Sequence, residues 1–452
     1  MRARRFSVAM SINGSGSGSG FNIETDLMTF GALGVYGVSI ITSIIIEESD
    51  SVVKVYDLPS ELIYHQIKNV CESIGIDSAK IGVLTNSEMI SSVAKALEEC
   101  NIKSVADPII VSKNGAKLLK DNALETLVKR LLPKTLITVL NVAEASILSG
   151  LKVENLEDAK LIARLIHERY GIPAVMIRGK ELRESKTMVD VLYYDNNYYF
   201  FESESSPREC YYEVNSSFSA TLAAYLAKGF AVIDAINEAK KFMTILLRYG
   251  IDINDDRCFI NPAVYIEIPA AKYEAIENVR KAVEILLENQ NLVLPYTPEV
   301  GINVAEAIKP MYVFSINDVA GVEGRIVKAG NRLIKVGEIR MGGSSHLARL
   351  LIALIRSGYS LRGAINVRFD KSLVEKAVRK GYKVVFIDRR KEPEEIKDAP
   401  TGTMEWIASQ ISDEIPDLIY DIGDIGKEPM IRILGDNSIR AVEKLIRILS
   451  DQ

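Results

Sequence analysis

Residues 80–109 read KIGVLTNSEMISSVAKALEECNIKSVADPI, and this stretch shows in full the unit from which the first half of the chain is built. Its ends, Lys80–Leu84 and Ser104–Ile109, are short apolar runs rich in β-branched residues, which favour strands. Between them, Ser87–Glu99 carries apolar residues at helical spacing. A strand, a helix and a second strand in this order predict parallel strands with the helix covering one face of the sheet.

The same alternation runs from the start of the chain to about residue 250. Strands are predicted at Ser7–Met10, Ser39–Ile46, Leu136–Leu140 and Ala174–Ile177, and helices at Ser60–Ile74 and Leu156–Tyr170. Two strands, Val189–Tyr194 and Tyr198–Glu204, are predicted to form a hairpin around Asp195-Asn-Asn197. Two helices are predicted after it, at Ser219–Lys228 and Val232–Arg248. We therefore expect a parallel α/β sheet covered by helices on both faces.

A polar, turn-rich stretch at Gly250–Pro262 separates this half from a second α/β segment. The second segment is predicted to open with a helix at Lys272–Glu288 and to close with one at Ser438–Leu449. We expect two domains, residues 1–255 and 272–452, which agrees with the 452-residue length at about 150 residues per domain.

Composition and charge exclude several classes of protein. With 48% hydrophobic and 25% charged residues the chain is an ordinary globular protein, and its net charge of −5 gives no basic field for nucleic acid. The longest apolar stretch, Leu33–Ile46, is interrupted by Gly, Ser and Thr, and Val8–Met10 is too short for the core of a signal peptide. We therefore expect no membrane span. The stretch Leu33–Ile46 is expected to be the end of a helix followed by a buried strand.

The four cysteines, Cys71, Cys100, Cys210 and Cys258, are widely spaced and form no C-x-x-C pair. This spacing argues against a zinc finger and against a disulfide framework. A reducing cytoplasm is the expected setting.

Candidate ligand-binding residues of the first half follow its predicted strands. The run GSGSGSG, residues 14–20, precedes a helical segment with Asp26, and such a turn brings backbone N–H groups close to a ligand. It lacks the Lys and the Gly spacing of a P-loop, so a flexible surface loop is the alternative. Polar residues at other strand ends lie where open α/β sheets bind ligands: Asp107-Pro108, Lys113-Asn-Gly115, Asn141 with Glu144, and Arg178-Gly-Lys180. Asn141 and Glu144 are candidates for holding Mg²⁺ through water, with helix capping as the alternative.

Residues 7–245 resemble the hydroxymethylpyrimidine/phosphomethylpyrimidine kinases. The resemblance rests on TDLMTFGALGVYG at 25–37, Lys80-Ile-Gly82, Asp107-Pro108, Asn141-x-x-Glu144 and SATLAAYLAKG at 219–229. It implies the ribokinase-like fold, a three-layer α/β/α sandwich, with ATP as phosphoryl donor. The matching site positions are Gly18, Gly20, Asp26, Glu47, Asp107, Asn141, Glu144, Arg178, Glu213 and Ser216.

Departures from this family concentrate at its phosphoryl-transfer loop. The family has Gly-Thr-Gly-Cys before its last long helix, where this chain has Glu213-Val-Asn-Ser216. The glycines that close the backbone on phosphate are missing, and Glu213 places a carboxylate where an anion would bind. The pyrimidine-contacting Gln of the family aligns with Glu47. We therefore interpret the first domain as a degenerate kinase with impaired or lost phosphoryl transfer.

The second half carries a candidate anion site with a titratable group. Leu333–Met341 alternates as a strand, Gly342-Gly343 ends it, and Ser344-Ser345 is suited to cap a helix that contains His346 and Arg349. His346 would lie in the first helical turn beside free N–H groups, whereas His65 and His167 lie within ordinary amphipathic helices. A Gly423/Gly426 loop ends in Lys427, and arginines follow strand ends or Gly turns at Arg325, Arg349, Arg368, Arg389 and Arg432.

Residues 275–450 resemble the archaeal-type thiamine-phosphate synthase domain. The motifs are Gly324-Arg-Ile326, SSHLAR at 344–349 and GKEPMIR at 426–432. The resemblance implies the condensation of hydroxymethylpyrimidine diphosphate with hydroxyethylthiazole phosphate, with Mg²⁺ as cofactor and Arg325 and His346 as catalytic residues. Substrate- and phosphate-binding candidates are Asn303, Gly342, Gly343, Ser344, Ser345, Arg349, Arg368, Asp388, Arg389, Lys427 and Arg432. Arginine and protonated His346 would stabilise the charge that develops on the departing diphosphate. The metal ligands are unknown.

Two alternatives stay open at this point. One is a fully bifunctional enzyme whose kinase works with Ser216 in the Cys position, and the other is a non-enzymatic sensor of thiamine phosphate. The expected partners are small-molecule substrates, and a homodimer is expected because both families commonly dimerise.

Overall fold

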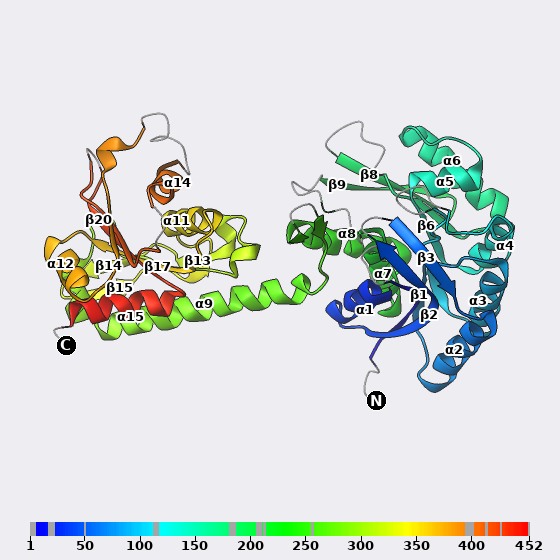
Figure 1. The fold of residues 1–452 in the computed structure, drawn as a ribbon, viewed down its shortest axis with the longest axis horizontal. Coiled ribbons are helices and arrows are strands. Elements are labelled where there is room, and N and C mark those ends of the chain that lie inside the picture. The colour runs from blue at the N-terminus through cyan, green and yellow to red at the C-terminus, as the bar shows by residue number, and fades with distance from the viewer. Residues whose placement is uncertain are drawn as a thin grey trace. The chain divides into compact units, whose positions relative to one another are not determined.

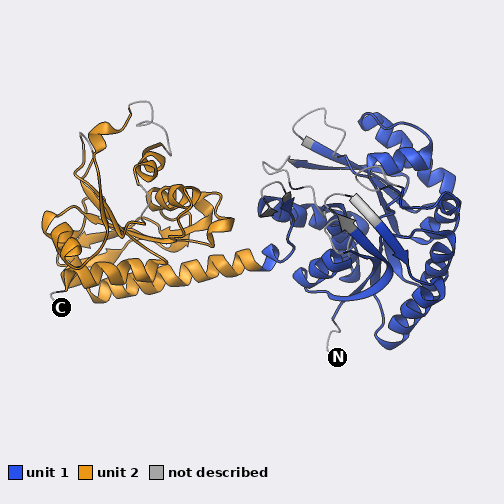
Figure 2. Ribbon diagram, in the orientation of Figure 1, with its two compact units in different colours: residues 1–266 blue, residues 267–452 orange. Residues whose placement is uncertain are grey.

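A computed structural model describes residues 6–16, 23–48, 51–111, 117–179, 187–204, 210, 214–254, 257–393, 402–411, 415–424 and 427–450. The chain divides into two compact units, residues 1–266 and 267–452 (Figure 2). Each unit has its own sheet and its own buried core. Among the helices within these ranges, none combines the length and the apolar character needed to cross a membrane.

The first unit is built on a nine-stranded sheet in the order β3-β2-β1-β4-β5-β6-β7-β8-β9. The strands from β2 to β7 run parallel, while β3, β8 and β9 are antiparallel additions at the two edges. Their bounds are β1 Val8–Gly16, β2 Tyr36–Glu48, β3 Ser51–Asp57, β4 Ser78–Ile81, β5 Lys103–Ala106, β6 Ile137–Leu140, β7 Ala174–Ile177, β8 Thr187–Tyr194 and β9 Asn197–Glu204.

Helices cover both faces of this sheet, which gives the predicted three layers (Figure 1). One face carries α2 Ser60–Ser73, α3 Ser87–Cys100, α4 Ala123–Thr126, α5 Val142–Ser149 and α6 Leu156–Tyr170. The other carries α1 Ile23–Ala32, α7 Val214–Ala227 and α8 Val232–Arg248. α7 is buried at every residue except Asn215 because it packs on the sheet between α1 and α8. A parallel sheet needs this double cover because both of its faces are apolar.

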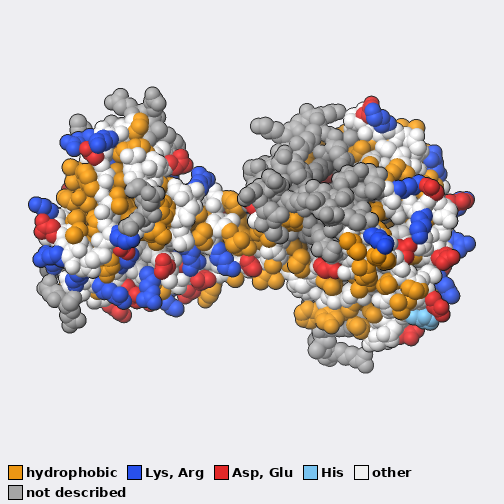
Figure 3. Space-filling view, in the orientation of Figure 1, with side chains coloured by type: hydrophobic (Ala, Val, Ile, Leu, Met, Phe, Trp, Pro, Cys, Tyr) orange, Lys and Arg blue, Asp and Glu red, His pale blue; other side chains and the backbone are white. Residues whose placement is uncertain are grey.

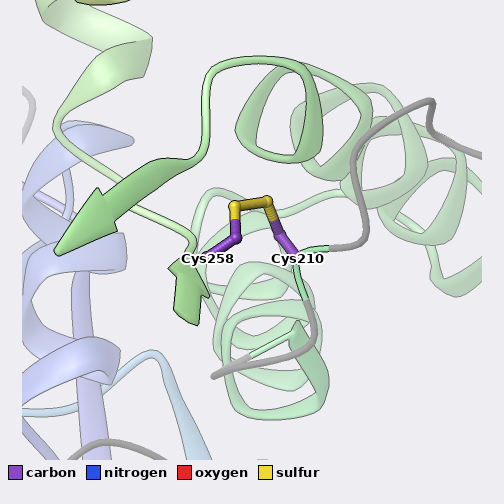
Figure 4. Close-up of a disulfide and its surroundings, with 2 residues drawn as sticks. All are labelled: Cys210 and Cys258. Atoms are coloured by element: carbon purple, nitrogen blue, oxygen red, sulfur yellow. A yellow bond between two sulfur atoms is a disulfide. The ribbon is translucent and has the colours of Figure 1, made fainter. Parts of the chain in front are cut away.

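Three features of the first unit differ from the sequence-based expectation. The strand β1 continues through Gly14–Gly16, so the glycine run begins within the sheet, and β3 is an additional edge strand. Cys210 and Cys258 form a disulfide with their Cα atoms 4.6 Å apart, which corrects the argument against disulfides (Figure 4). The two cysteines are close in space although they are far apart in sequence. The hairpin of β10 Ile251–Asn254 and β11 Arg257–Phe259 brings Cys258 back to Cys210, which precedes α7.

The second unit contains a seven-stranded sheet in the order β16-β13-β12-β17-β20-β19-β18, antiparallel except for the β18–β19 pair. The strands are β12 Val304–Ala307, β13 Val319–Val322, β16 Ile339–Met341, β17 Gly363–Arg368, β18 Val384–Ile387, β19 Leu418–Asp421 and β20 Met430–Gly435. A separate hairpin consists of β14 Ile326–Ala329 and β15 Arg332–Lys335. The single strand predicted over 333–341 is therefore wrong: it is divided between this hairpin and the edge strand β16.

Helices lie on both sides of the second sheet (Figure 1). α11 Ser345–Arg356 packs with α14 Gly402–Ser409, and α15 Ser438–Leu449 packs on the opposite face beside α9 Val264–Glu288. Two shorter helices are α10 Gln290–Val293 and α12 Lys371–Arg379. Lys and Arg alternate with Asp and Glu over the outer faces of α9 and α15, as amphipathic surface helices require (Figure 3).

Candidate functional site

The second unit contains a cavity of about 530 Å³ above β12, β17 and β20. The N-terminus of α11, the turn before β14, the first turn of α14 and the segment before β20 supply its walls. Its lining includes five cationic side chains, Arg325, Arg349, Arg389, Lys427 and Arg432, together with His346. Because cations gather here in a chain of negative net charge, the cavity is suited to a highly anionic ligand.

The N-terminus of α11 places His346 in this cavity. Ser344 is the N-cap, its side chain makes no capping hydrogen bond, and His346 is the second helical residue. The backbone N–H groups of this turn have no partner within the helix and add positive potential at the same point. Gly343 makes the turn possible, because a Cβ there would lie 2.2 Å from the carbonyl oxygen of Gly321 in β13.

The surroundings of His346 favour a neutral imidazole, whereas the sequence led us to expect an imidazolium. Its pKa is lowered to about 3, first by burial and then by the charges of Arg432, Arg325, Arg389 and Arg349, in that order. Arg432 Nε donates a hydrogen bond to His346 Nε2 over 3.3 Å. Sequence spacing identified the helix N-terminus but not the effect of the four arginines on the ring.

Two buried carboxylates hold the cations of one wall. Asp421 at the end of β19 accepts from Arg432 Nη1 at 2.8 Å and from the backbone N–H of Gly423 at 3.0 Å. Arg389 Nη1 lies 3.9 Å from the same carboxylate. Burial lowers the pKa of Arg432, an effect that Asp421 opposes, so the pairing is what keeps this guanidinium charged within the unit.

Glu392 performs the same task for the neighbouring cations. It accepts from Arg389 Nε and Lys427 Nζ, each at 3.0 Å, and from the hydroxyl of Thr403. Burial alone would raise its pKa, but the hydrogen bonds from Thr403 and Lys427 and the charge of Arg389 lower it. Three separate segments are thereby tied together at this wall.

Arg325 and Arg349 are the least neutralised cations of the cavity. Arg325 adopts a left-handed backbone with φ of 71°, directly after Gly324, and its guanidinium donates to the Val300 carbonyl. Within the described ranges neither arginine forms an ion pair with a carboxylate. A non-glycine residue at positive φ stores strain, and such strain is typically found at binding sites.

Three predicted binding residues do not line the cavity. Gly342 has a φ of 75° and serves the turn before α11. Arg368 is exposed and donates to the Pro295 carbonyl, while Asp388 caps a short 3₁₀ helix and pairs with Arg390 at 2.8 Å. Their places at strand ends have turn and surface roles in this structure, and phosphate contacts by them stay a prediction.

Asn303 lines the cavity, but its amide is committed to the sheet. Its Oδ1 accepts from Val322 N at 3.0 Å and its Nδ2 donates to Val322 O at 2.8 Å. Asn366 supports it in turn by accepting from Asn303 N at 2.8 Å. We therefore assign Asn303 a role in holding β12 against β13 rather than in binding a ligand.

Sequence reasoning missed part of the lining. The additional residues are Val300, Gly324, Leu347, Asn366, Thr403, Met404, Glu428 and Met430. Several belong to the quoted motifs but have side chains without an obvious ligand chemistry. Glu392 and Asp421 were missed as counter-charges because nothing in their spacing links them to distant arginines.

The carboxylates of this cavity do not fit a protein-held Mg²⁺. Glu428 accepts from the backbone N–H groups of Glu299 and Val300, and Glu392 and Asp421 are engaged by cations. Throughout the described part of the chain, no group of three or more His, Cys, Asp or Glu side chains is placed to hold a metal ion. We derive no step through Mg²⁺ from these residues.

The first unit has a buried polar network at the positions that resemble a kinase site. Asp26 accepts from Ser11 Oγ at 2.5 Å, Lys80 Nζ at 3.0 Å and Ser216 Oγ at 2.9 Å, and Asn13 donates to it at 3.1 Å. Lys80 also donates to Ser216 Oγ at 2.9 Å. Lys80 and Asp26 are fully buried, so their mutual pairing is what makes burial of both charges tolerable.

Asp107 and Arg178 lie near this network. Burial raises the pKa of Asp107 to about 6, against the opposing charge of Lys80. Arg178 stacks on Phe218 with its guanidinium carbon 4.0 Å from the ring centroid, and Nε lies 3.3 Å from an oxygen of Asp190. Nε and Nη1 of Arg178 make no hydrogen bond in the described ranges, so the ion pair with Asp190 and the contact with Phe218 are what hold this guanidinium.

Other predicted positions of the first unit have local roles or are not described. Asn141 and Glu144 form a reciprocal capping box at the start of α5, which supports the capping alternative. Gly18, Gly20, Glu213 and the Lys113-Asn-Gly115 patch lie outside the described residues, as does the side chain of Glu47.

The two remaining histidines are confirmed as surface and packing residues. His65 is exposed beside Glu61. His167 bonds through Nδ1 to the Ile172 carbonyl at 2.7 Å, with its ring edge against Tyr193. His346 is therefore the histidine that faces a polar cavity.

Comparison with known proteins identifies both units. The family model described as phosphomethylpyrimidine kinase matches residues 14–261, and that of thiamine-phosphate synthase ThiN matches residues 278–447. The chain is 30% identical to the bifunctional thiamine biosynthesis protein ThiDN of Methanocaldococcus jannaschii over 451 residues, 97% of each chain. A hydroxymethylpyrimidine/phosphomethylpyrimidine kinase of Rhizobium meliloti is 32% identical over 238 residues, 52% of this chain and 88% of that protein.

A solved structure supports the fold of the first unit. The ADP complex of Bacillus subtilis pyridoxal kinase superposes with a TM-score of 0.54 at 30% identity, covering 57% of this chain and 98% of that one. The ribokinase-like expectation for the first unit is thus confirmed. The chain belongs to the family of bifunctional thiamine biosynthesis proteins, in which a phosphomethylpyrimidine kinase unit is followed by a thiamine-phosphate synthase unit.

Proposed function

We propose that the cavity of the second unit joins hydroxymethylpyrimidine diphosphate to hydroxyethylthiazole phosphate. The observation that carries this proposal is the convergence of five cationic side chains and the N-terminus of α11 on one cavity. Both substrates are phosphorylated, so they bring several negative charges to the same place. Arg325 and His346, the residues expected to be catalytic, both line this cavity.

The chemistry requires charge stabilisation more than a base. The thiazole nitrogen uses its lone pair to form a C–N bond to the pyrimidine CH₂ carbon. The C–O bond to diphosphate breaks, and its electron pair leaves with the diphosphate oxygen. The attacking nitrogen carries no proton, so the developing negative charge is the main problem, and preorganised cations and N–H donors solve it. Arg325 and Arg349, free of carboxylate partners in the described ranges, are suited to this task.

A direct assay tests the proposal. The full chain is supplied with both substrates and Mg²⁺, and thiamine phosphate and inorganic diphosphate are measured together. We expect both products in equal amounts. Binding of thiamine phosphate without its synthesis would instead identify the unit as a sensor.

For the first unit we propose pyrimidine or nucleotide binding with impaired phosphoryl transfer. Ser216 replaces the cysteine of the resembling kinases, and its hydroxyl is already engaged by Asp26 and Lys80. The sequence Glu213-Val-Asn also lacks the glycines of an anion-binding loop. Asp26 and Lys80, which stand at positions that match the kinases and pair with each other, support retained binding of a ligand.

A phosphorylation assay with ATP and hydroxymethylpyrimidine tests this second proposal. We expect turnover about 10²-fold or more below that of the Rhizobium meliloti relative, the scale of losing one oxyanion donor. Replacing residues 213–216 by Gly-Thr-Gly-Cys is expected to raise the rate. Robust turnover by the unmodified chain would show a fully bifunctional enzyme instead.

A further inference from the structure

A chain of three side chains runs from the sheet of the second unit to the candidate catalytic imidazole. Asp421 Oδ2 accepts from Arg432 Nη1 at 2.8 Å, and Arg432 Nε donates to His346 Nε2 at 3.3 Å. Asp421 ends β19, Arg432 lies in β20 and His346 begins α11. The three residues are far apart in sequence, so only the fold brings them together.

The direction of these hydrogen bonds determines where the proton of His346 lies. An arginine side chain donates and cannot accept, so His346 Nε2 must be the acceptor. A neutral imidazole has one N–H, and that hydrogen is therefore on Nδ1. Within the described ranges Nδ1 has no hydrogen-bond partner, while His346 lines the cavity.

We propose that Asp421 and Arg432 are positioning residues that fix His346 as the Nδ1–H tautomer, so that its N–H is available to an anionic oxygen of the departing diphosphate. This inference rests on the proposed condensation. It changes the role of His346 from a charged group to a neutral donor, and it assigns a role to Asp421. No proton is transferred: Nδ1–H donates throughout, and the electron pair of the broken C–O bond stays on diphosphate.

The surroundings of the ring explain why a neutral donor is favoured here. Arg432 of β20, Arg325 of the turn before β14, Arg389 of the 3₁₀ helix after β18 and Arg349 of α11 all oppose a charge on His346. Arg432 is only 2% exposed and is held by Asp421, so its Nε is fixed in one place. A fixed donor on one ring nitrogen selects the tautomer, as partners of metal-bound histidines do.

Nuclear magnetic resonance of ring-¹⁵N histidine in the full chain observes the tautomer directly. Loss of signals in His346→Gln identifies the resonances of His346 among three histidines. At neutral pH we expect the proton on Nδ1, and inorganic diphosphate is expected to shift the Nδ1 resonance most. If His346→Gln does not fold, His65→Gln and His167→Gln assign the other two histidines and leave the resonances of His346. A proton on Nε2 of His346, or a charged ring, in the wild-type protein would overturn the proposal.

Substitutions then test the two positioning residues. In Arg432→Met we expect His346 to lose its preference for the Nδ1–H tautomer. In Asp421→Asn we expect this preference to be weaker and kcat to be about 10- to 100-fold lower, with KM changed much less. Asp417→Asn is the matched control, because Asp417 precedes the other end of β19 and pairs with Lys444 away from the cavity. Equal effects of Asp417→Asn and Asp421→Asn on the tautomer and on kcat would contradict the assignment.

The spectrum and the activity separate this inference from the proposed function. If the wild-type chain makes no thiamine phosphate but His346 keeps its proton on Nδ1, the condensation is wrong and the tautomer assignment stands. If the chain is active with the proton on Nε2, the condensation stands and the positioning role is wrong.

Discussion

At the scale of single residues, the unusual feature of the second unit is an imidazole that shares one cavity with four arginines, whose charges all lower its pKa. The sequence predicted that His346 begins a helix at an anion site, because Gly342-Gly-Ser-Ser345 ends a strand and suits a cap. It did not predict a neutral ring, because that depends on arginines from distant segments. The same limit applies to Arg368 and Asp388, whose strand-end positions resembled ligand contacts.

The first prediction concerns the effect of Arg325 and His346 on the rate of condensation. Arg325→Ala and His346→Ala are each expected to lower the rate of condensation about 10²- to 10³-fold, the cost of one preorganised donor to a developing anion. Steady-state release of diphosphate measures this, with circular dichroism to show an intact fold. His65→Ala, an exposed control, is expected to keep full activity. Near-normal rates for both cavity variants would refute their assignment.

The low pKa of His346 predicts how stability depends on pH. The folded-state pKa of about 3 lies below the ordinary 6.5, so the unfolded chain takes up a proton first as the pH falls. Stability is therefore lost as pH drops below 6.5, by about 2 kcal/mol near pH 5 for this group alone. Denaturant unfolding of wild type and His346→Gln measures it. A pH dependence that His346→Gln leaves unchanged would contradict the low pKa.

At the scale of elements, the regular strands and helices were predictable because their apolar periods are clear. The predicted segments Leu156–Tyr170, Ala174–Ile177 and Ser438–Leu449 agree with the structure at both ends. The failures are local: β1 continues into its glycine run, and Leu333–Met341 is divided between two sheets. The period of the apolar residues predicts whether a segment is a helix or a strand. The strands with which it pairs determine where that segment ends.

The turn before α11 depends on Gly343. In Gly343→Ala the added Cβ would meet the Gly321 carbonyl oxygen at 2.2 Å, so the helix N-terminus must move away from β13. We expect a loss of about 1–3 kcal/mol in the free energy of unfolding and reduced condensation. Gly31→Ala, where an added methyl meets nothing within 4 Å, is the control for thermal unfolding. Unchanged activity and stability in Gly343→Ala would show that this packing is not required.

The disulfide of the first unit predicts a redox-dependent stability. Cys210 and Cys258 are 48 residues apart, and closing such a loop stabilises a protein by up to about 4 kcal/mol. Cys258→Ser and chemical reduction are each expected to lower the unfolding temperature of this unit, and reduction should add nothing in Cys258→Ser. Cys71→Ser serves as the control because Cys71 is not in a disulfide. Equal thermal unfolding of oxidised and reduced wild type would contradict the stabilising role.

At the scale of the whole molecule, the chain joins two units with separate sheets and cores. Composition and alternation predicted two α/β units, and the motif resemblance predicted the families, which the comparisons confirm. The homodimer stays a prediction. What sequence could not supply is the arrangement of the cavity in the second unit, because its cationic side chains come from four parts of the chain.

The lining residues that the structure describes all lie within residues 267–452. We expect the separate fragment 267–452 to retain condensation with a kcat similar to that of the full chain. Gel filtration and circular dichroism establish that the fragment is folded. A folded but inactive fragment would show that the first unit contributes to the reaction.

The most direct test of the account is the condensation assay on the full chain, with wild type and Arg325→Ala side by side. With hydroxymethylpyrimidine diphosphate, hydroxyethylthiazole phosphate and Mg²⁺, we expect thiamine phosphate and diphosphate in equal amounts from wild type and about 10²-fold slower formation by the variant. Tight binding of thiamine phosphate with no product formed would contradict it.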